Sequence, residues 1–204
     1  MMKRLTQHNI FVALIVSISS LASASEDEAF ARWLQELKRD AAAQGISDET
    51  IAQAIDGLRP LPKVLKLQLH QPERTMSVET YLANVVSPTR VQTGKRLLSK
   101  HAELLADVSE THGIQPRFIV ALWGLESDFG ANSGGFPTIA SLATLAQGGR
   151  RRDYFRRELM AALKLIDRGE TRAETMYGSW AGAMRQCQFM PSNFLRHAVD
   201  QDGD

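Results

Sequence analysis

The sequence contains a single cysteine, Cys187, in 204 residues. One cysteine cannot form a disulfide within the chain, which excludes a fold held together by disulfides and leaves packing as the source of stability. We therefore interpret Cys187 as a small packed residue in preference to a reactive thiol. The histidines show no paired spacing of the kind that is typical of a metal site.

The sequence also lacks an excess of positive or negative charge. The chain has 24 basic and 23 acidic residues, with a formal net charge of +1. This balance argues against a nucleic-acid-binding protein, which would carry a basic patch. With 44% hydrophobic and 23% charged residues, the composition excludes disorder and is sufficient for one sizeable core. Internal repeats and low-complexity linkers are absent from the sequence.

The first residues differ from the rest of the chain. Lys3 and Arg4 precede an apolar segment over residues 10–21, and small residues follow at 22–24. This layout predicts a secretory signal peptide over residues 1–24, cleaved after Ala24. A membrane anchor is the weaker alternative, because a bilayer span needs about 20 apolar residues. The residue directly after the cleavage site is Ser25 and not cysteine, so a lipid-modified amino terminus is not indicated. We expect a periplasmic or other extracytoplasmic product without a transmembrane anchor.

Apolar residues in the remaining chain recur mostly at helical spacing, and strand signals are sparse. The spacing predicts a helix around Phe30 that stops near Gly45, and a short helix capped by Ser47. One long surface helix is expected from 88 to 113, with Gly113 as its left-handed cap, and Pro116 is expected to start the next helix. Residues 63–73 are left undecided between strand and helix.

Glu126 follows a run of apolar residues and glycine at positions 118–125. A helix without a polar face is expected to be buried on all sides. Burial and the negative end of the helix dipole would both disfavour the charged carboxylate, and a carboxyl group that keeps its proton near neutral pH suits a general acid. A buried glutamate paired with an arginine for structural reasons is the alternative. Asp128 would point roughly 200° away on a continuous helix, so a single acid is the simpler interpretation.

Four segments carry a resemblance to a known family. The run ALWGLESDFG, residues 121–130, resembles the segment around the acid in type-B lytic murein transglycosylases, which are relatives of the lysozyme superfamily and form glycoside hydrolase family 103. The arginine pair Arg150 and Arg151, the GSWAGAM loop at 178–184 and the QFMPS run at 188–192 follow in the family's order and spacing. The resemblance runs from about Phe30 to the last residue.

The resemblance implies a mainly α, lysozyme-like α+β architecture, with residues 25–204 forming the N-terminal portion of a catalytic domain that is incomplete at its C-terminal end. It implies a peptidoglycan lytic transglycosylase that cleaves the MurNAc-GlcNAc β-1,4 bond and leaves 1,6-anhydromuramyl ends. Glu126 would act as acid and then as base. The sugar's N-acetyl group would stabilise the anomeric centre, so a second carboxylate is unnecessary. The partners implied are peptidoglycan glycan strands, and protein partners are not indicated.

The resemblance also assigns substrate-binding residues. Ser179 and Gln188 would contact the polar groups of amino sugars, and Trp180 would face the groove. Arg150 and Arg151, placed against the dipole at a helix start, would hold carboxylates of peptide stems. Hydrogen bonding within the loop is the alternative for Ser179, and a solvated basic face is the alternative for the arginines. That second interpretation is preferred for Arg152, Arg156 and Arg157.

Two features depart from the family pattern. Arg185 stands where the family has glycine, and its side chain could obstruct the groove or strain the backbone. Asp200, Asp202 and Asp204 resemble the first, third and fifth positions of an EF-hand calcium loop whose remaining ligands would lie beyond the chain. We therefore expect no required cofactor, and structural calcium only in a full-length form. The alternative functions are a lysozyme-type hydrolase and a catalytically inactive peptidoglycan-binding or scaffold protein.

Overall fold

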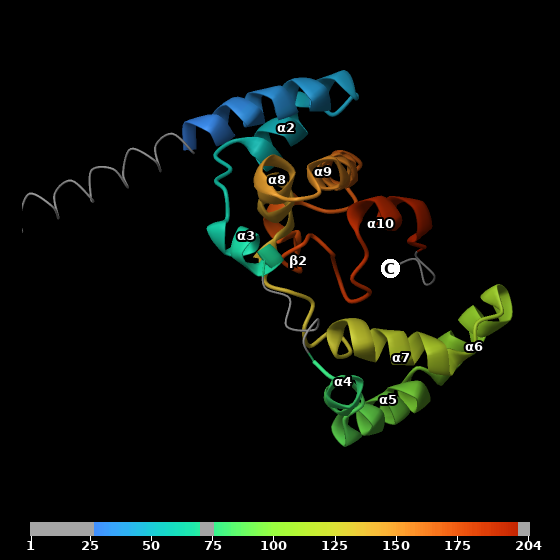
Figure 1. Cartoon of the computed structure of the whole chain (residues 1–204). Helices are drawn as coiled ribbons and strands as arrows, with labels where there is room; N and C mark the ends of the chain where they lie inside the picture. The colour runs from blue at the N-terminus through green and yellow to red at the C-terminus, as the bar shows by residue number, and fades with distance from the viewer. Residues whose placement is uncertain (1–26, 70–75, 200–204) are drawn as a thin grey trace, which may run out of the picture.

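The computed structural model describes residues 27–69 and 76–199, and its elements are mostly helical (Figure 1). A first helix covers residues 27–43. The other helices are α2 (Asp48–Ile55), α3 (Pro62–Leu69), α4 (Val78–Val85), α5 (Pro88–Lys100), α6 (Ala102–His112), α7 (Pro116–Ser127), α8 (Thr138–Gly148), α9 (Arg152–Asp167) and α10 (Pro191–His197), with a short 3-10 helix η2 (Ala173–Thr175). Strands β1 (Phe136–Pro137) and β2 (Tyr177–Gly178) pair antiparallel, with Phe136 opposite Gly178. The mainly α architecture expected from the sequence is confirmed.

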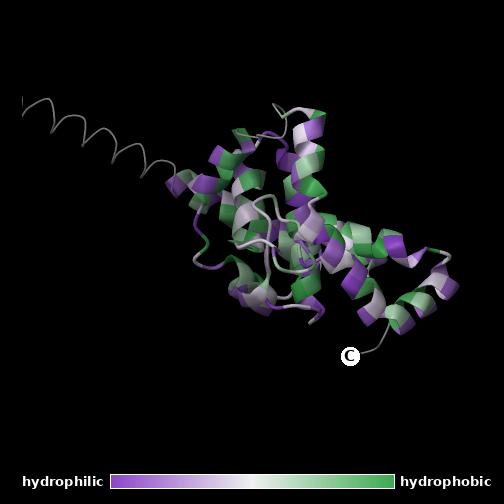
Figure 2. Ribbon diagram, turned by 90° about the horizontal axis from the view of Figure 1, so that it is seen from below, coloured by the Kyte–Doolittle hydropathy of each residue, from purple (hydrophilic) through white to green (hydrophobic). Residues whose placement is uncertain are grey.

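The main core forms around α8, which is buried from Thr138 to Ala146. Helix α9 packs along α8 and also contacts α2 and α10, while α3 covers another side of α8. The first helix contributes the expected stripe, since Phe30, Leu34 and Leu37 are buried in the same cluster. Hydrophobic and hydrophilic positions alternate along these helices (Figure 2), as expected when each helix buries one face.

A second, smaller cluster joins α5, α6 and α7. Its buried residues are Leu97, Leu105 and Val120, and Trp123 and Phe129 pack against it. Figure 1 shows α4 to α7 as a separate layer below the main core. This layer carries Glu126, so the position of that carboxylate depends on how the layer is joined to the rest of the protein.

The helix ends follow the local signals closely. Ser47 Oγ accepts a hydrogen bond from Thr50 N at 3.2 Å, as expected for a helix cap. Gly113 adopts the left-handed conformation with φ of 69°, and Pro116 begins α7. Residues 63–69 of the undecided segment are helical and belong to α3, while the rest of that segment reaches residues outside the described part.

The expected single helix from 88 to 113 is wrong. The helix is interrupted at His101, whose backbone lies at φ −109° and ψ 28°, so that α5 ends and α6 begins there. The break lets Leu97 of α5 and Leu105 of α6 reach the same small cluster. A continuous helix could not fold back around α7 in this way.

The expectation that the apolar run 118–125 is buried on all sides is also wrong. Only Val120, Gly124 and Ser127 of α7 are buried, whereas Phe118, Leu122 and Leu125 are 53%, 58% and 51% exposed. Within the described residues, α7 packs on α5 and α6 along one stripe only. Composition predicted an apolar helix correctly, but burial also requires neighbours on every face.

Candidate active site

Glu126 occupies the last turn of α7, and its side chain is exposed. Within the described residues, its carboxylate makes no hydrogen bond and no ion pair with another side chain. The expected burial and the alternative of an arginine-paired structural glutamate are therefore both incorrect for the described part of the chain. The carboxyl group is instead free to meet a ligand from solvent.

The backbone next to Glu126 is firmly held. Asp128 and Phe129 adopt positive φ values of 51° and 58°, which turn the chain sharply after α7. Ser127 is buried, and its hydroxyl accepts a hydrogen bond from Gly130 N at 3.0 Å. The ring of Phe129 lies against Gly124, where an added Cβ would come within 2.7 Å of the ring. These contacts anchor the helix end that presents Glu126.

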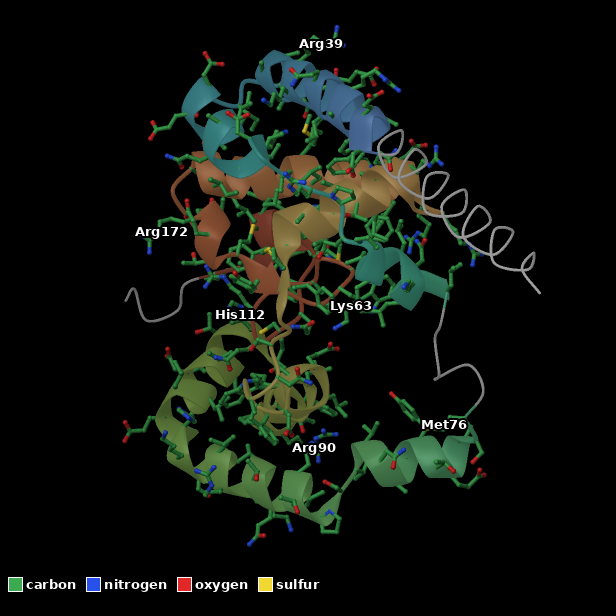
Figure 3. All side chains as sticks on the ribbon, turned by 90° about the vertical axis from the view of Figure 1, so that its left-hand side faces the viewer. Arg39, Lys63, Met76, Arg90, His112 and Arg172 are labelled. Carbon is green, nitrogen blue, oxygen red and sulfur yellow. The ribbon has the colours of Figure 1, made fainter. Side chains whose placement is uncertain are left out.

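Asp128 does not form a pair with Glu126. It lies outside the helix as the C-terminal cap, so the rotation argument made for a continuous helix does not apply to it. Its Oδ1 accepts a 3.0 Å hydrogen bond from Arg90 Nε, and Arg90 Nη1 also donates to the carbonyl of Val85. Arg90 lies at the start of α5, within the layer formed by α4 to α7 (Figure 3). This ion pair occupies Asp128 and leaves Glu126 as the unpaired carboxylate.

The GSWAGAM loop is a tight turn built on Ser179. Ser179 N donates to Ala183 O at 2.8 Å, and Ser179 Oγ accepts from Ala183 N at 3.1 Å. The loop hydrogen bonding given as the alternative for Ser179 is therefore present. Gly134 must be glycine here, because a Cβ would lie 2.1 Å from the carbonyl oxygen of Gly178. The loop after α7 thus lies directly against the GSWAGAM loop.

Gln188, the first residue of the QFMPS segment, contacts the segment that follows α7. Its Nε2 donates to Ser133 O at 3.1 Å and to Arg185 O at 2.8 Å. Met184 bridges to both Gly178 and Phe189, so the two motif loops form one connected backbone unit. The structure therefore brings the loop after α7, Ser179 and Gln188 together.

Gln186 is a contact residue that sequence reasoning missed. Its Oε1 accepts a 2.6 Å hydrogen bond from Trp123 Nε1, one turn before Glu126 on α7. Trp123 also packs edge-on against Phe129 and His101. Gln186 lies between two motifs in the sequence and matches neither, so no local signal marked it.

Arg185 adopts a positive φ of 56°, which explains why glycine would suit this position. Its guanidinium lies 5.2 Å from the ring centroid of Phe194 and donates to the carbonyl of Glu170 at 3.4 Å. Both partners belong to the main-core side of the loop. The side chain is thus turned toward α10 and the turn that follows α9, whereas Gln186 contacts α7.

Arg150 and Arg151 are exposed in the turn before α9, which begins at Arg152. The guanidinium of Arg151 lies 4.0 Å from the ring centroid of Tyr154, and Arg150 N donates to Gln68 Oε1. None of the contacts within the described residues joins either arginine to Glu126, Ser179 or Gln188. Trp180 is half-buried and packs against the edge of the main core.

The remaining expectations concern the single cysteine, metal ligands, the two ends of the chain and membrane-spanning helices. Cys187 is exposed, so the interpretation as a packed residue is wrong. In the described part of the chain, no group of three or more histidine, cysteine, aspartate or glutamate residues could hold a metal ion. Asp200, Asp202 and Asp204, and the signal peptide over residues 1–24, lie outside the described residues. Among the helices that the structure describes, none has the length and apolar character required to span a bilayer.

A cavity of about 280 Å³ lies beside the turn that carries Glu126, between α5 and α7. Its lining includes the apolar residues Val91, Val120, Leu125 and Phe129, together with three cations, Arg90, Lys95 and Arg117. Glu126, Ser179 and Gln188 do not line this cavity. Ser179 and Gln188 instead lie where the segment that follows α7 meets the two motif loops.

Known proteins resemble this chain in sequence and in structure. Membrane-bound lytic murein transglycosylase B of Escherichia coli (strain K12) is 33% identical over 125 residues, which is 61% of this chain and 35% of that protein. The structure of SltB3 from Pseudomonas aeruginosa in complex with NAG-NAM-pentapeptide superimposes with a TM-score of 0.83 at 40% identity, covering 86% of this chain and 47% of SltB3. The Escherichia coli lytic transglycosylase Slt35 in complex with calcium gives a TM-score of 0.74 at 28% identity, covering 84% of this chain and 55% of Slt35.

The chain therefore spans between about a third and just over half of the length of these relatives. The transglycosylase SLT domain family matches residues 29–204, which is most of the sequence. The resemblance inferred from the four motifs is confirmed, and the chain belongs to the transglycosylase SLT domain family.

Proposed function

We propose that the chain acts on peptidoglycan as a lytic transglycosylase, cleaving the MurNAc-GlcNAc β-1,4 bond and leaving 1,6-anhydromuramyl ends. The observation that carries this proposal is the exposed and unpaired carboxyl group of Glu126 at an anchored helix end. The loops of Ser179 and Gln188 lie beside the turn that follows this helix. Family membership supports the same reaction class.

Glu126 can perform both proton transfers of this reaction. As an acid it donates its proton to the glycosidic oxygen while the bond from that oxygen to the muramyl anomeric carbon breaks. The muramyl 6-hydroxyl then attacks the anomeric carbon, and the carboxylate takes the hydroxyl proton. The glutamic acid is thereby restored without consumption of water. The substrate's N-acetyl group stabilises the positive charge in between, which is compatible with Asp128 being occupied by Arg90.

The proposed substrate contacts use groups that the fold leaves available. Ser179 accepts a hydrogen bond from Ala183 N, so its own hydroxyl proton is free for a sugar acetamido or hydroxyl oxygen. Gln188 donates through Nε2, which leaves its amide oxygen to accept from the sugar. Trp180 would offer a ring face to a sugar, and Arg150 and Arg151 would bind stem carboxylates.

We also propose that residues 1–24 export the chain to the periplasm or another extracytoplasmic space, and that residues 25–204 form the N-terminal portion of the catalytic domain. The reaction proposed for Glu126 needs no metal ion. Calcium is present in the structure of the relative Slt35, and Asp200, Asp202 and Asp204 are the residues of this chain that would contribute to such a structural site.

Digestion of purified sacculi tests the proposed reaction. We expect the chain to release muropeptides with anhydro ends by mass spectrometry, and Glu126→Gln to lower their release by at least about a hundredfold. Asp128→Asn serves as a control, and we expect it to retain most of the activity. Reducing ends in place of anhydro ends would identify a lysozyme-type hydrolase. Products that persist in Glu126→Gln would contradict both reactions.

A catalytically inactive peptidoglycan-binding protein is the second candidate. The observation that favours it is the open, apolar surface of α7 around Glu126, where Leu122 and Leu125 are more than half exposed. A general acid works best where water is excluded, and the described residues do not enclose Glu126. Sedimentation of the chain with sacculi, without release of soluble products, would establish this second function.

A further inference from the structure

A second cavity of about 550 Å³ lies away from Glu126, in the groove between α9 and α10. In Figure 1 α9 lies above α10, whereas α7, which carries Glu126, lies below α10. On α9 the lining residues Arg157, Met160, Ala161 and Lys164 fall at the spacing of one helix face. Their counterparts on α10 are Ser192, Leu195 and Arg196, again on one face. The cavity is thus built by two packed helices, and its size is within the range of ligand sites.

The charges around this cavity are unbalanced. Arg156 is paired with Asp40 and lies 5.6 Å from the ring centroid of Trp33, so it is already engaged. By contrast, Arg157, Lys164 and Arg196 form no ion pair with any residue in the described part of the chain. These three side chains therefore keep their donors available for an anion.

Glu158 is a carboxylate next to this groove, and its oxygens are already bound to Ser192. It is 5% exposed, and its two oxygens accept from Ser192 N at 2.9 Å and Ser192 Oγ at 2.7 Å. Glu158 therefore holds the start of α10 against α9 beneath the cavity. Counting Asp40 and Glu158 against the four cations leaves an excess of two positive charges.

The floor of the cavity is apolar. Met160 and Ala161 are buried, and Leu195 is half-buried beside them. An apolar floor rimmed by guanidinium and ammonium groups suits a ligand with a short aliphatic part and more than one carboxylate. A flat membrane surface would need protruding cations rather than a recessed floor, so a lipid bilayer is the poorer fit.

We propose that the α9–α10 groove is a second binding site, separate from the loops around Glu126, for the acidic peptide stems of peptidoglycan. The identity of this ligand rests on the proposed function, whereas the preference for a carboxylate-bearing peptide rests on the groove itself. A stem held here would keep the chain on the cell wall while the loops around Glu126 engage a glycan strand, which raises the effective concentration of that strand.

Binding of a free stem pentapeptide without sugar tests this site directly. Isothermal titration at low salt would compare the wild type with the variant Arg157→Ala/Lys164→Ala/Arg196→Ala. The matched control is Arg96→Ala/Lys100→Ala/Arg172→Ala, which removes three exposed cations elsewhere (Arg172 is labelled in Figure 3). We expect the groove variant to bind about tenfold more weakly and the control to bind like the wild type. Thermal unfolding confirms that all three proteins are folded.

Further binding measurements distinguish the possible outcomes. The same pentapeptide with amidated carboxylates should bind at least about tenfold more weakly, and salt should weaken the binding of the unmodified peptide. Equal affinity of the groove variant and the wild type would overturn the proposal. So would groove-dependent binding of phosphatidylglycerol vesicles or inorganic phosphate without binding of the pentapeptide. Glu126→Gln should bind the pentapeptide normally, so loss of sacculus digestion and loss of peptide binding can be told apart.

Discussion

Trp123 Nε1 donates a 2.6 Å hydrogen bond to Gln186 Oε1, and this bond joins the helix that carries Glu126 to the loop that leads into Gln188. Gln188 in turn donates to Ser133 O in the segment that follows α7. The α4–α7 layer and the main core are thus connected at the place where the motif residues meet. The alignment of Glu126 with the two motif loops depends on these few polar contacts.

Removing the Trp123–Gln186 hydrogen bond should impair activity more than stability. For Gln186→Ala we expect about 1 kcal/mol lower free energy of unfolding. The release of anhydro-muropeptides should fall by about tenfold, because small misplacements of catalytic groups are costly. Trp123→Phe, which keeps an aromatic ring beside Phe129, is the matched variant. The double variant should be no worse than either single one, and additive losses would show that the two residues act independently.

Gly124 should not tolerate a side chain. An added Cβ would lie 2.7 Å from the ring of Phe129, so Gly124→Ala must displace that ring from the small cluster. We expect a loss of about 1–3 kcal/mol in the free energy of unfolding, measured by urea denaturation. Gly148→Ala is the control, because its Cβ would meet Leu65 at an ordinary 3.7 Å. Equal stability of the two variants would mean that the α7 cluster is loosely packed.

Asp167 should contribute to the pH dependence of stability. Hydrogen bonds from the hydroxyl and backbone N–H of Ser47 hold the pKa of Asp167 below its ordinary value of 3.8. A carboxyl group with a lowered pKa stabilises the fold above its unfolded pKa, and this contribution is lost as the pH falls through the folded pKa. The wild type should therefore lose more stability on acidification below about pH 4 than Asp167→Asn does.

Thermal unfolding across an acidic pH series provides this measurement. Glu36→Gln, which changes an exposed carboxylate on the first helix, is the control and should follow the wild type. Identical pH profiles for the wild type and Asp167→Asn would contradict the assigned role of the Ser47 contacts. Ser47→Ala should bring the wild-type profile closer to that of Asp167→Asn, since it removes the Ser47 hydroxyl, the donor that lowers the pKa of Asp167 most.

Local signals in the sequence predicted much of the fold. The stripe of Phe30, Leu34 and Leu37, the cap at Ser47 and the left-handed Gly113 all depend on residues within a few positions of each other. The motif residues were found in the same way, and the structure joins Ser179 and Gln188 to the segment after α7. Gln186 could not be found, because its partner Trp123 is 63 residues away in the chain.

The errors share one physical cause. A run of apolar residues reveals that a helix is apolar, but the exposure of Leu122, Leu125 and Glu126 depends on which neighbours reach α7. The break at His101 likewise serves the packing of Leu97 and Leu105 around α7. Burial, ion pairing and the faces of helices are properties of distant residues brought together.

The sequence by itself determined the helical class, the family and the identity of Glu126 as the candidate acid, because periodicity and motifs are local patterns. Only the tertiary structure decided that Glu126 is exposed and unpaired, that Asp128 is held by Arg90, and that unpaired cations surround a groove between α9 and α10. The reason is that hydration and charge pairing at a side chain are set by residues that the chain brings near it from far away in sequence.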